Sequence, residues 1–502
     1  MISAGDAVAL SVALPIAGAG AVWLLDRAPN LREAATLLTG AALVALTLVV
    51  FLAVGEGARP GYFVFTVIGG LPIEFQAEPL GAMFAVLASV LWFVNSLYSI
   101  GYMRGHHEKH QTRFYMCFAV AIAAAMGVAY AANLFTLFIF YEVLTLSTFP
   151  LVTHKGDDAA RFGGRVYIGI LMGTSIGLLL PAIIWVYSIA GTTNFTPGGV
   201  LATPLADAGA LPVILMGLFA FGIGKAALMP VHPWLPNAMV APTPVSAFLH
   251  AVAVVKAGVF SVLKVAVYIF GLDFLSASGA SAPFMWIAAA SILLASAIAM
   301  HKDNLKARLA YSTVSQLSYV TLGAMLATQM GVMGGAMQIA AHAAGKMTLF
   351  MCAGAIYVGA HKTLVSEVRG LGRKMPFTFI AFFIGAMSIV GLPPMGGSWP
   401  KFLLMLGAAD AGQLAIIGVL IVSSLLNVVY LLSIPVQAFY LEPAEAGAKP
   451  QGSGAPAIDW RNIEEAPALC VIPPLITALF ALLLFIFADP LYAYLAPIAE
   501  AR

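Results

Sequence analysis

The stretch FAFGIGKAALMPVHPWLPNAMVAPTPVSAFLHAVAVVKAGVFSVLK, residues 219–264, predicts how the rest of the chain is organised. It is typical of two consecutive membrane-spanning helices, the first broken by the proline-rich run MPVHPWLP at residues 229–236. Each helix carries a lysine, Lys225 and Lys256. An ionisable residue at bilayer depth costs about 2.5 kcal/mol or more, so it marks a candidate functional site. A broken helix at this depth is tolerated where its backbone is buried in protein or lines a wet cavity. The pattern therefore predicts a path for protons.

The composition is that of a polytopic membrane protein. Of 502 residues, 61% are hydrophobic and 9% are charged, and the mean hydropathy is +0.96. A soluble protein of this length cannot bury so much apolar surface. The net charge of +2 argues against nucleic-acid binding. Cys117, Cys352 and Cys470 form no CxxC pair, so we expect no disulfide framework, iron–sulfur cluster or zinc site.

Apolar segments long enough to span a bilayer recur along the whole chain, and we expect an all-α fold of about 14 transmembrane helices. No strands are predicted. The segments are residues 7–25, 34–54, 80–100, 114–131, 133–152, 166–190, 211–229, 245–270, 284–300, 309–327, 332–360, 377–408 (interrupted), 414–439 and 466–487.

Charge in the connections predicts the orientation. Connections after odd-numbered helices hold nearly all the loop lysines and arginines, whereas connections after even-numbered helices hold Arg59 alone. The positive-inside rule then places the odd connections in the cytoplasm and both termini outside. The longest polar connections are residues 55–79, outside, and the Gly- and Pro-rich residues 441–465, inside. We expect a multi-pass protein of a prokaryotic cytoplasmic membrane.

A second helix break predicts an internal repeat. The twelfth segment is interrupted by GLPPMGG at residues 391–397, and Lys401 follows once the helix resumes. Paired interruptions in the two halves of a hydrophobic chain are typical of inverted repeats around a midplane site. One integral membrane domain is expected. Its predicted parts are residues 1–113, a first repeat at 114–270, a second repeat at 283–440, and a linker with the last helix at 441–502.

Glu142 is the one carboxylate placed inside a predicted span. Beside Lys225 it can stay ionised and form a pair that responds to charges arriving nearby; the alternative is a static ion pair that locks two helices. Lys225, Lys256 and Lys401 are the centre of the hypothesis, because burial favours the neutral form of an amine and allows it to exchange protons. Their alternative role is to bind carbonyls at helix ends. That role suits Lys401 better than Lys256, which has no predicted break beside it.

Four further bases are candidate relay groups. His342 and Lys346 are four residues apart and share one helix face, where Tyr311, Ser312, Ser315 and Gln316 can supply partners. His250 is equally compatible with a hydrogen-bonded interior histidine. His232, in the first break, completes the set. Lys264 lies near a helix end and is expected to extend to the interface.

Several other chemistries are not supported by the sequence. Gly224-Lys225 and Gly345-Lys346 are followed by Ala226 and Met347, so neither belongs to a phosphate-binding P-loop. A dehydrated Na⁺ site needs several hard oxygens, and one intramembrane carboxylate supplies few, although carbonyls at the breaks can add more. We expect no cofactor, no metal, and no redox or hydrolytic site in this chain.

Four segments resemble the antiporter-like proton-translocating subunits of respiratory complex I, and their relatives in Mrp cation/proton antiporters and membrane-bound hydrogenases. They are FYEVLTLSTFPLV, GKAALMPVHPWLPNAMVAPTPVSAFLHAVAVVKAGVF, HAAGKMTLF and GLPPMGGSWPKF. The resemblance implies two inverted five-helix repeats with broken helices seven and twelve. It also implies functional roles for Glu142, Lys225, Lys256 and Lys401, and a hydrated axis through His250, His342 and Lys346.

Our hypothesis is a subunit of a multisubunit membrane complex that moves H⁺ along this axis of Glu, Lys and His. In one form of this hypothesis, the chain is the ion-translocating subunit of an NADH:quinone oxidoreductase-type translocase. One alternative is a Mrp-type subunit that exchanges Na⁺ or K⁺ for H⁺ without redox chemistry. Another is an energy-coupling or scaffold subunit of a hydrogenase or inorganic-carbon uptake complex. In each case the expected partners are other membrane subunits and the lipid bilayer.

Overall fold

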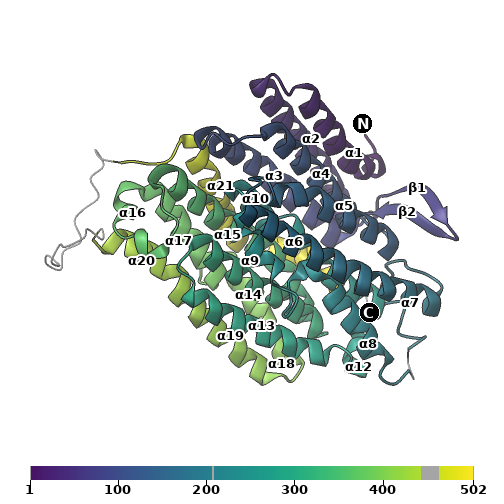
Figure 1. Ribbon diagram of the computed structural model, residues 1–502. Helices are drawn as coiled ribbons and strands as arrows, with labels where there is room; N and C mark the ends of the chain where they lie inside the picture. Colours follow the sequence, from purple (N-terminus) through teal and green to yellow (C-terminus); the bar gives the residue numbers. More distant parts are fainter. Residues whose placement is uncertain (1, 206–207, 443–462, 501–502) are drawn as a thin grey trace.

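A computed structural model describes residues 2–205, 208–442 and 463–500, and these form a layered body of helices from which one hairpin projects (Figure 1). The first half contains α1 (Ala4–Leu24), α2 (Pro29–Gly55), β1 (Gly61–Ile68), β2 (Leu71–Gln76), α3 (Pro79–Gly105), α4 (Gln111–Ala129), α5 (Leu134–Val152), α6 (Asp158–Thr174), α7 (Leu180–Ala190), α8 (Leu211–Gly222), η2 (Gly224–Ala226), α9 (Trp234–Asn237), η3 (Ala238–Val240), α10 (Thr243–Ala251), α11 (Val254–Val265) and α12 (Leu272–Ser278). The second half contains α13 (Ala282–His301), α14 (Leu305–Met325), α15 (Gln329–Ala360), α16 (Leu371–Lys374), α17 (Pro376–Val390), α18 (Ser398–Asp410), α19 (Leu414–Asn427), α20 (Ser433–Tyr440), α21 (Ala468–Ile486) and α22 (Ala488–Glu500).

The predicted all-α polytopic fold is confirmed, and each predicted segment coincides with one helix or with consecutive helices. In the described part of the chain, 11 helical runs are long and apolar enough to cross a membrane. The helices α8 and α17 are apolar but shorter, because each ends at a break. The count of fourteen spans and the division into repeats stay predictions. The predicted flexible connection 441–465 lies mostly outside the described residues.

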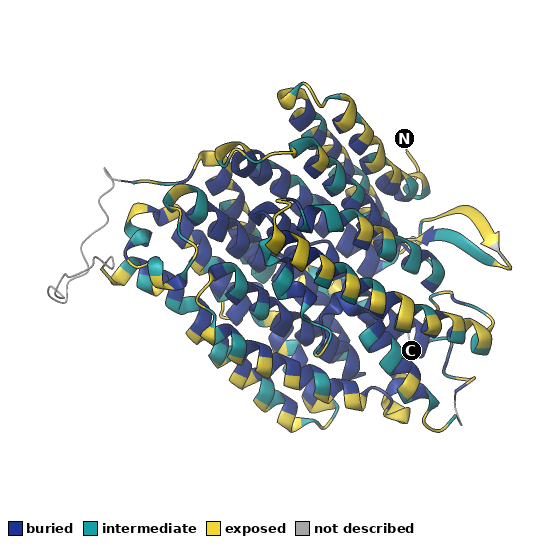
Figure 2. Cartoon of the chain, viewed as in Figure 1, coloured by how far each residue is buried: buried dark blue, intermediate teal, exposed yellow. Residues whose placement is uncertain are grey.

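The expectation of no strands was wrong. Residues 55–79 hold an antiparallel hairpin of β1 and β2, with Ile68 paired to Leu71 across Gly69-Gly70. Both glycines have positive φ, 52° and 82°, which a two-residue hairpin link requires and which glycine adopts without steric cost. The Gly-Gly pair between apolar runs is a hairpin signal that hydropathy alone does not reveal. Strand β1 is exposed over residues 61–67, whereas β2 is mostly half-buried (Figure 2).

Two helix breaks lie where the sequence predicts them. The first follows α8, where η2 and α9 replace a continuous helix, and the second separates α17 from α18. At the second break Gly391 has φ 87°, which ends α17 in a left-handed conformation.

A third break was not predicted. The helix is interrupted between the end of α10 at Ala251 and the start of α11 at Val254, where the N–H groups of Val252 and Ala253 both donate to the carbonyl of Phe248. The expectation that Lys256 has no break beside it was therefore wrong. The local sequence AVAVV contains neither glycine nor proline, so tertiary packing overrides the local preference here.

The two runs that carry the central bases are the most deeply enclosed. Thr243–Phe270 and α15 are entirely buried over their apolar windows. The helix α15 packs against α3, α10, α14, α17, α18 and α21. By contrast α1 and α2 lie at the periphery and expose apolar side chains such as Trp23 and Leu38 (Figure 2). The interior bases thus lie away from any lipid-facing surface.

Close packing of α11 against the first break requires a glycine at position 258. A Cβ atom at Gly258 would lie 2.3 Å from the backbone carbon of Lys225. We expect Gly258→Val to destabilise the protein by about 1–3 kcal/mol, measured as a lower Tm of the purified protein in detergent. Gly418→Ala is the control, because no atom lies within 4 Å of the added methyl group. Equal Tm values for the Gly258→Val variant and the unmodified chain would contradict this packing.

Candidate functional site

Four predicted amines lie inside the protein. Lys225, Lys256 and Lys346 have no exposed surface, and Lys401 is 5% exposed. They come from η2, α11, α15 and α18, so three broken or interrupted helices and one long helix contribute. Each amine must find hydrogen-bond acceptors within the protein, since a buried charge without partners is costly.

The break after α8 turns the Lys225 side chain toward α5. Its amine donates to the carbonyl of Tyr141 at 2.8 Å and to the hydroxyl of Thr145 at 2.6 Å. The backbone N–H of Lys225 donates to the Tyr141 hydroxyl at 3.0 Å. The amine also lies 3.1 Å from the centre of the Tyr141 ring, a cation–π contact. Lys225 is thus bound to α5 through neutral groups.

Glu142 does not form the expected direct ion pair with Lys225. Among the described residues, no salt bridge within 4.0 Å joins them. Neither carboxylate oxygen of Glu142 has a hydrogen-bond partner within the described chain, although both oxygens are buried. The static ion pair that locks two helices is therefore not the arrangement seen.

The central bases come together between α10, α11 and α15. The amine of Lys256 forms a hydrogen bond with Nδ1 of His342. One turn further along α15, Lys346 donates to the carbonyl of Leu309 at 3.1 Å. Both ring nitrogens of His250, and Nε2 of His342, have no partner in the described part of the chain. This arrangement offers several proton acceptors within one enclosed region.

Lys401 lies at the second break. Its amine donates to the carbonyl of Val390, the last residue of α17, at 2.7 Å, and to the hydroxyl of Ser424 at 3.3 Å. It also lies 5.0 Å from the centre of the Tyr319 ring. Binding to a helix-end carbonyl was the alternative role considered for this lysine, and that contact is present. Proton exchange by Lys401 stays a prediction.

Hydroxyl and amide groups on α14 and α15 lie between the central bases and Lys401. Gln338 donates to Gln316 at 2.8 Å. The amide nitrogen of Gln316, the amide oxygen of Gln338 and the Tyr319 hydroxyl are buried without a partner among the described residues. Gln338, Thr145 and Tyr319 were not among the site residues predicted from the sequence. Tyr319 had a signal, since it follows Gln316 by three residues on the same helix face.

His232 lies apart from this group. It is half-buried in the first break, and its ring centre is 6.2 Å from that of Tyr311. A direct contact with the central bases is not seen among the described residues, so its relay role stays a prediction. Within the described residues, no three His, Cys, Asp or Glu side chains gather in an arrangement that could hold a metal ion.

Two further charged pairs correct the sequence analysis. Lys264 does not extend to the interface, because it is 1% exposed. Its amine donates to the carbonyl of Ala131 at 2.7 Å and lies 3.8 Å from the carboxylate of Glu78. Glu33 is a second carboxylate inside a helix, because α2 begins before the predicted boundary; it is buried and paired with Arg104. Neither partner is close in sequence, so spacing could not reveal these pairs.

The Lys264–Glu78 pair yields a stability prediction. We expect Glu78→Gln to destabilise the protein by about 3 kcal/mol, since it leaves the buried Lys264 charge without its counter-ion. The N–H groups of Leu80 and Gly81 donate to different oxygens of the Glu78 carboxylate, at 2.8 and 2.9 Å, and the glutamine keeps one of these two acceptors. The double variant Glu78→Gln with Lys264→Met should regain much of the loss. Thermal unfolding in detergent of the unmodified protein, the single variants Glu78→Gln and Lys264→Met, and the double variant measures this, and additive losses in the double variant would show that the two charges are not coupled.

Comparison with known proteins places the site within a matched region. Residues 131–427 match the family described as NADH:quinone oxidoreductase/Mrp antiporter, TM. Residues 65–115 match the N-terminus of chain 5 of NADH-ubiquinone oxidoreductase (complex I). The first match covers every predicted site residue.

Individual relatives agree with this match. The chain is 31% identical over 426 residues to NADH-quinone oxidoreductase subunit N of Desulforudis audaxviator, covering 83% of this chain and 82% of the relative. It is 26% identical over 429 residues to a Na(+)/H(+) antiporter subunit of Alkalihalophilus pseudofirmus, covering 85% and 83%. Some other relatives are longer, and the chain spans about half of their length.

The fold has a close structural counterpart. A chain of the Mrp complex from Dietzia sp. superimposes with a TM-score of 0.85 at 22% identity, covering 100% of this chain and 97% of that one.

Proposed function

We propose, because this chain belongs to the NADH:quinone oxidoreductase/Mrp antiporter transmembrane family, that it moves H⁺ through the membrane as one subunit of a multisubunit complex. The observation that carries the proposal is the set of enclosed lysines Lys225, Lys256, Lys346 and Lys401, whose hydrogen-bond partners are carbonyls, hydroxyls and the His342 imidazole. A lysine bound only to carbonyls, hydroxyls or imidazole can lose its proton without breaking an ion pair. Such an amine is suited to carry protons.

Unpaired polar atoms support a continuous path between the bases. A buried polar atom without a partner costs about 1–3 kcal/mol, and buried water commonly satisfies such atoms. The atoms concerned are on Glu142, His250, His342, Gln316, Gln338 and Tyr319. They lie on α5, α10, α14 and α15, the elements that carry or flank the amines. We infer that water enters along this row and links the first break to the second.

Coupling between the bases follows from their burial. Charges are weakly screened in a low-dielectric interior, so a proton arriving at one base lowers the proton affinity of the next. Glu142 sets the state of Lys225 in this scheme, and the Lys256–His342 contact passes the effect on to Lys346. Lys401, beside the second break, is the terminal exchange group. Movement of H⁺ is thereby linked to charge changes imposed by neighbouring subunits.

The site variants Lys225→Ala and Glu142→Ala test this function. Each should lower proton flux by about 100-fold, since a proton-transferring group contributes that much or more, while the assembled complex persists. Flux is measured as acidification of proteoliposomes that contain the purified complex. Lys374→Ala is the matched control, because that lysine is about half-exposed and pairs with Glu464 at the surface. Normal flux in either assembled site variant would remove that residue from the path.

Exchange of Na⁺ is a second candidate function. The similarity to the Na(+)/H(+) antiporter of Alkalihalophilus pseudofirmus favours it. Na⁺-dependent proton movement in proteoliposomes without any electron donor would support this candidate. Coupling or scaffolding for a hydrogenase or an inorganic-carbon partner is a third candidate, and unchanged coupled activity in Lys256→Ala would favour it.

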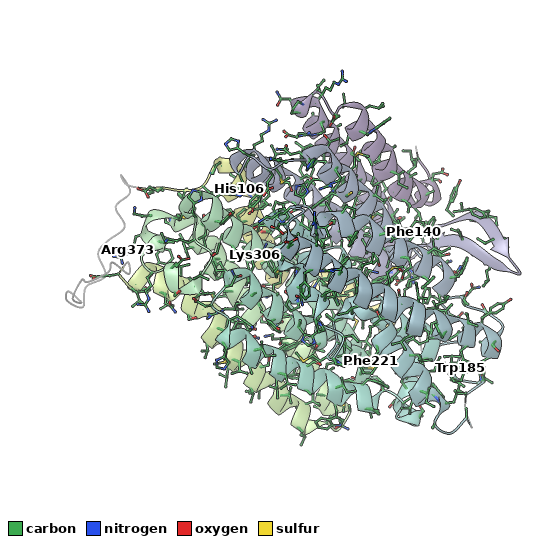
Figure 3. The ribbon with its side chains drawn as sticks, viewed as in Figure 1. His106, Phe140, Trp185, Phe221, Lys306 and Arg373 are labelled. Carbon is green, nitrogen blue, oxygen red and sulfur yellow. The ribbon has the colours of Figure 1, made fainter. Side chains whose placement is uncertain are left out.

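The proposed orientation places the arginine- and lysine-rich connections in the cytoplasm of a prokaryotic cell and both termini outside. His106 and Arg373, from two of these connections, lie toward one end of the helical body, and Trp185 lies toward the other (Figure 3). We expect a small epitope tag after Met1 to be accessible on intact spheroplasts, whereas a cysteine at Asp158 should react with impermeant thiol reagents only in inverted vesicles. The opposite labelling pattern would reverse the orientation.

A further inference from the structure

A pocket with a volume of about 560 Å³ lies where the end of α1, the start of α2, the end of α3 and the start of α4 meet. It is separate from the row of bases proposed to carry protons. Residues of both signs of charge line it. The charged residues of its lining are Asp26, Arg32, Arg104, Glu108 and Arg113. A pocket of this size can hold a small polar molecule or the headgroup of a lipid.

The pocket lies at the depth where a membrane meets water. The helices α1 and α2 are at the edge of the helical body (Figure 1). Trp23, at the end of α1, is 62% exposed, and Leu24 and Leu31 beside it are exposed as well. Exposed tryptophans are enriched at the level of the lipid headgroups. Asp26 follows Trp23 by three residues and lines the pocket, so a molecule in the pocket is at headgroup depth.

Most charges of the pocket are not paired with one another. Arg104 is an exception, because it binds Glu33. Among the described residues, Asp26 and Glu108 have no basic nitrogen within 4.0 Å, and Arg113 has no carboxylate oxygen within that distance. Positive and negative groups thus line the same pocket without neutralising each other. A ligand that carries both charges can pair with both sets.

Arg32 supplies a cation that is held in a fixed orientation. It is 5% exposed, and its guanidinium donates to the Thr112 hydroxyl at 2.9 Å and to the side-chain oxygen of Gln111 at 2.8 Å. Its Nη2 lies 3.7 Å from a carboxylate oxygen of Glu33, and its Nε has no hydrogen-bond partner within the described chain. Because the side chain is already ordered, an anion that binds beside it pays little entropy for fixing it.

Two helix N-termini add positive potential to the pocket. The helix α2 begins at Pro29 and α4 begins at Gln111, and neither start has a hydrogen bond from a capping side chain. Both residues line the pocket. The first N–H groups of a helix have no partner within the helix, and the helix dipole favours an anion there. Together with Arg32 and Arg113, these N-termini favour a phosphate group.

We propose that this pocket binds the headgroup of a membrane phospholipid that carries a primary ammonium group, such as phosphatidylethanolamine. The phosphate accepts hydrogen bonds from Arg32, Arg113 and the first N–H groups of α4, and the ammonium donates to Asp26 and Glu108. The acyl chains follow the exposed apolar side chains of α1 and α2. The lipid thereby ties the peripheral pair α1 and α2 to α3 and α4. This inference does not depend on the proposed function.

The chemistry of the headgroup makes the proposal specific. A choline headgroup carries the same charges, but its methylated nitrogen has no N–H to donate to the two carboxylates. A glycerol headgroup keeps the phosphate and lacks the cation. Of these three lipids, the one with the ethanolamine headgroup satisfies both sets of charges in the pocket.

Titration of the purified, delipidated complex with lipid, followed by native mass spectrometry, tests the proposal. The lipids are phosphatidylethanolamine, phosphatidylcholine and phosphatidylglycerol with the same acyl chains. We expect one molecule of the ethanolamine lipid to bind about tenfold more tightly than either of the others, the effect of one hydrogen bond between charged groups. Equal affinity for the choline or the glycerol lipid would overturn the proposal.

Two sets of variants separate the two halves of the headgroup. Asp26→Asn combined with Glu108→Gln should remove the preference for ethanolamine and leave binding of the choline lipid unchanged. Arg113→Gln should weaken both lipids by about tenfold. None of these three side chains is buried, so the folded core is kept. Arg161→Gln is the control, because that arginine is exposed, pairs with Asp158 and does not line the pocket.

The remaining outcomes identify a different occupant. Lipid binding that is the same in the unmodified complex and in both sets of variants would overturn the proposal. A photoreactive residue at position 26 should cross-link to lipid in the intact complex; cross-linking to another subunit instead would show that protein covers the pocket and would also overturn it. Soluble phosphoethanolamine has the same headgroup without acyl chains and should not displace the lipid at equal concentration. Displacement would assign the pocket to a soluble ligand, against the proposal.

Discussion

The structure depends on hydrogen bonds from its buried lysine amines to uncharged acceptors. Lys225 binds the carbonyl of Tyr141 and the hydroxyl of Thr145, and Lys401 binds the last carbonyl of α17. The Lys401 acceptor is at a helix end, where the last four C=O groups have no partner within the helix. The Lys225 acceptors lie inside α5 instead. The second break thus frees a carbonyl that accepts from Lys401, and the first break turns Lys225 toward α5.

This arrangement differs in kind from the charged pairs nearer the ends of the helices. Lys264 with Glu78, and Arg104 with Glu33, join opposite charges, and each fixes one helix to another. The interior amines have no such counter-ions within hydrogen-bonding reach in the described chain. The protein therefore combines two kinds of buried charge: paired charges that hold the fold together, and interior bases whose protonation can change at lower cost.

Much of this could be predicted from the sequence, because charge in an apolar segment is conspicuous. Lys225, Lys256, Lys346 and Lys401 were found in that way, and proline and glycine marked two breaks. The acceptors were harder to predict, since a carbonyl such as that of Tyr141 has no sequence signature. The break before Lys256 has neither glycine nor proline, so only packing specifies it. Glu78 could not be matched to Lys264, because distance along the chain carries no information about which helices become neighbours.

The interruption between α10 and α11 also has an electrostatic effect. Peptide dipoles in a helix leave partial positive charge at the N-terminus and partial negative charge at the C-terminus. His250 lies in the last turn of α10, and Lys256 lies in the first turn of α11. The gap therefore has the negative end of one helix dipole beside the histidine and the positive end of the other beside the lysine. Two residues of non-helical backbone thus give a direction to the local potential.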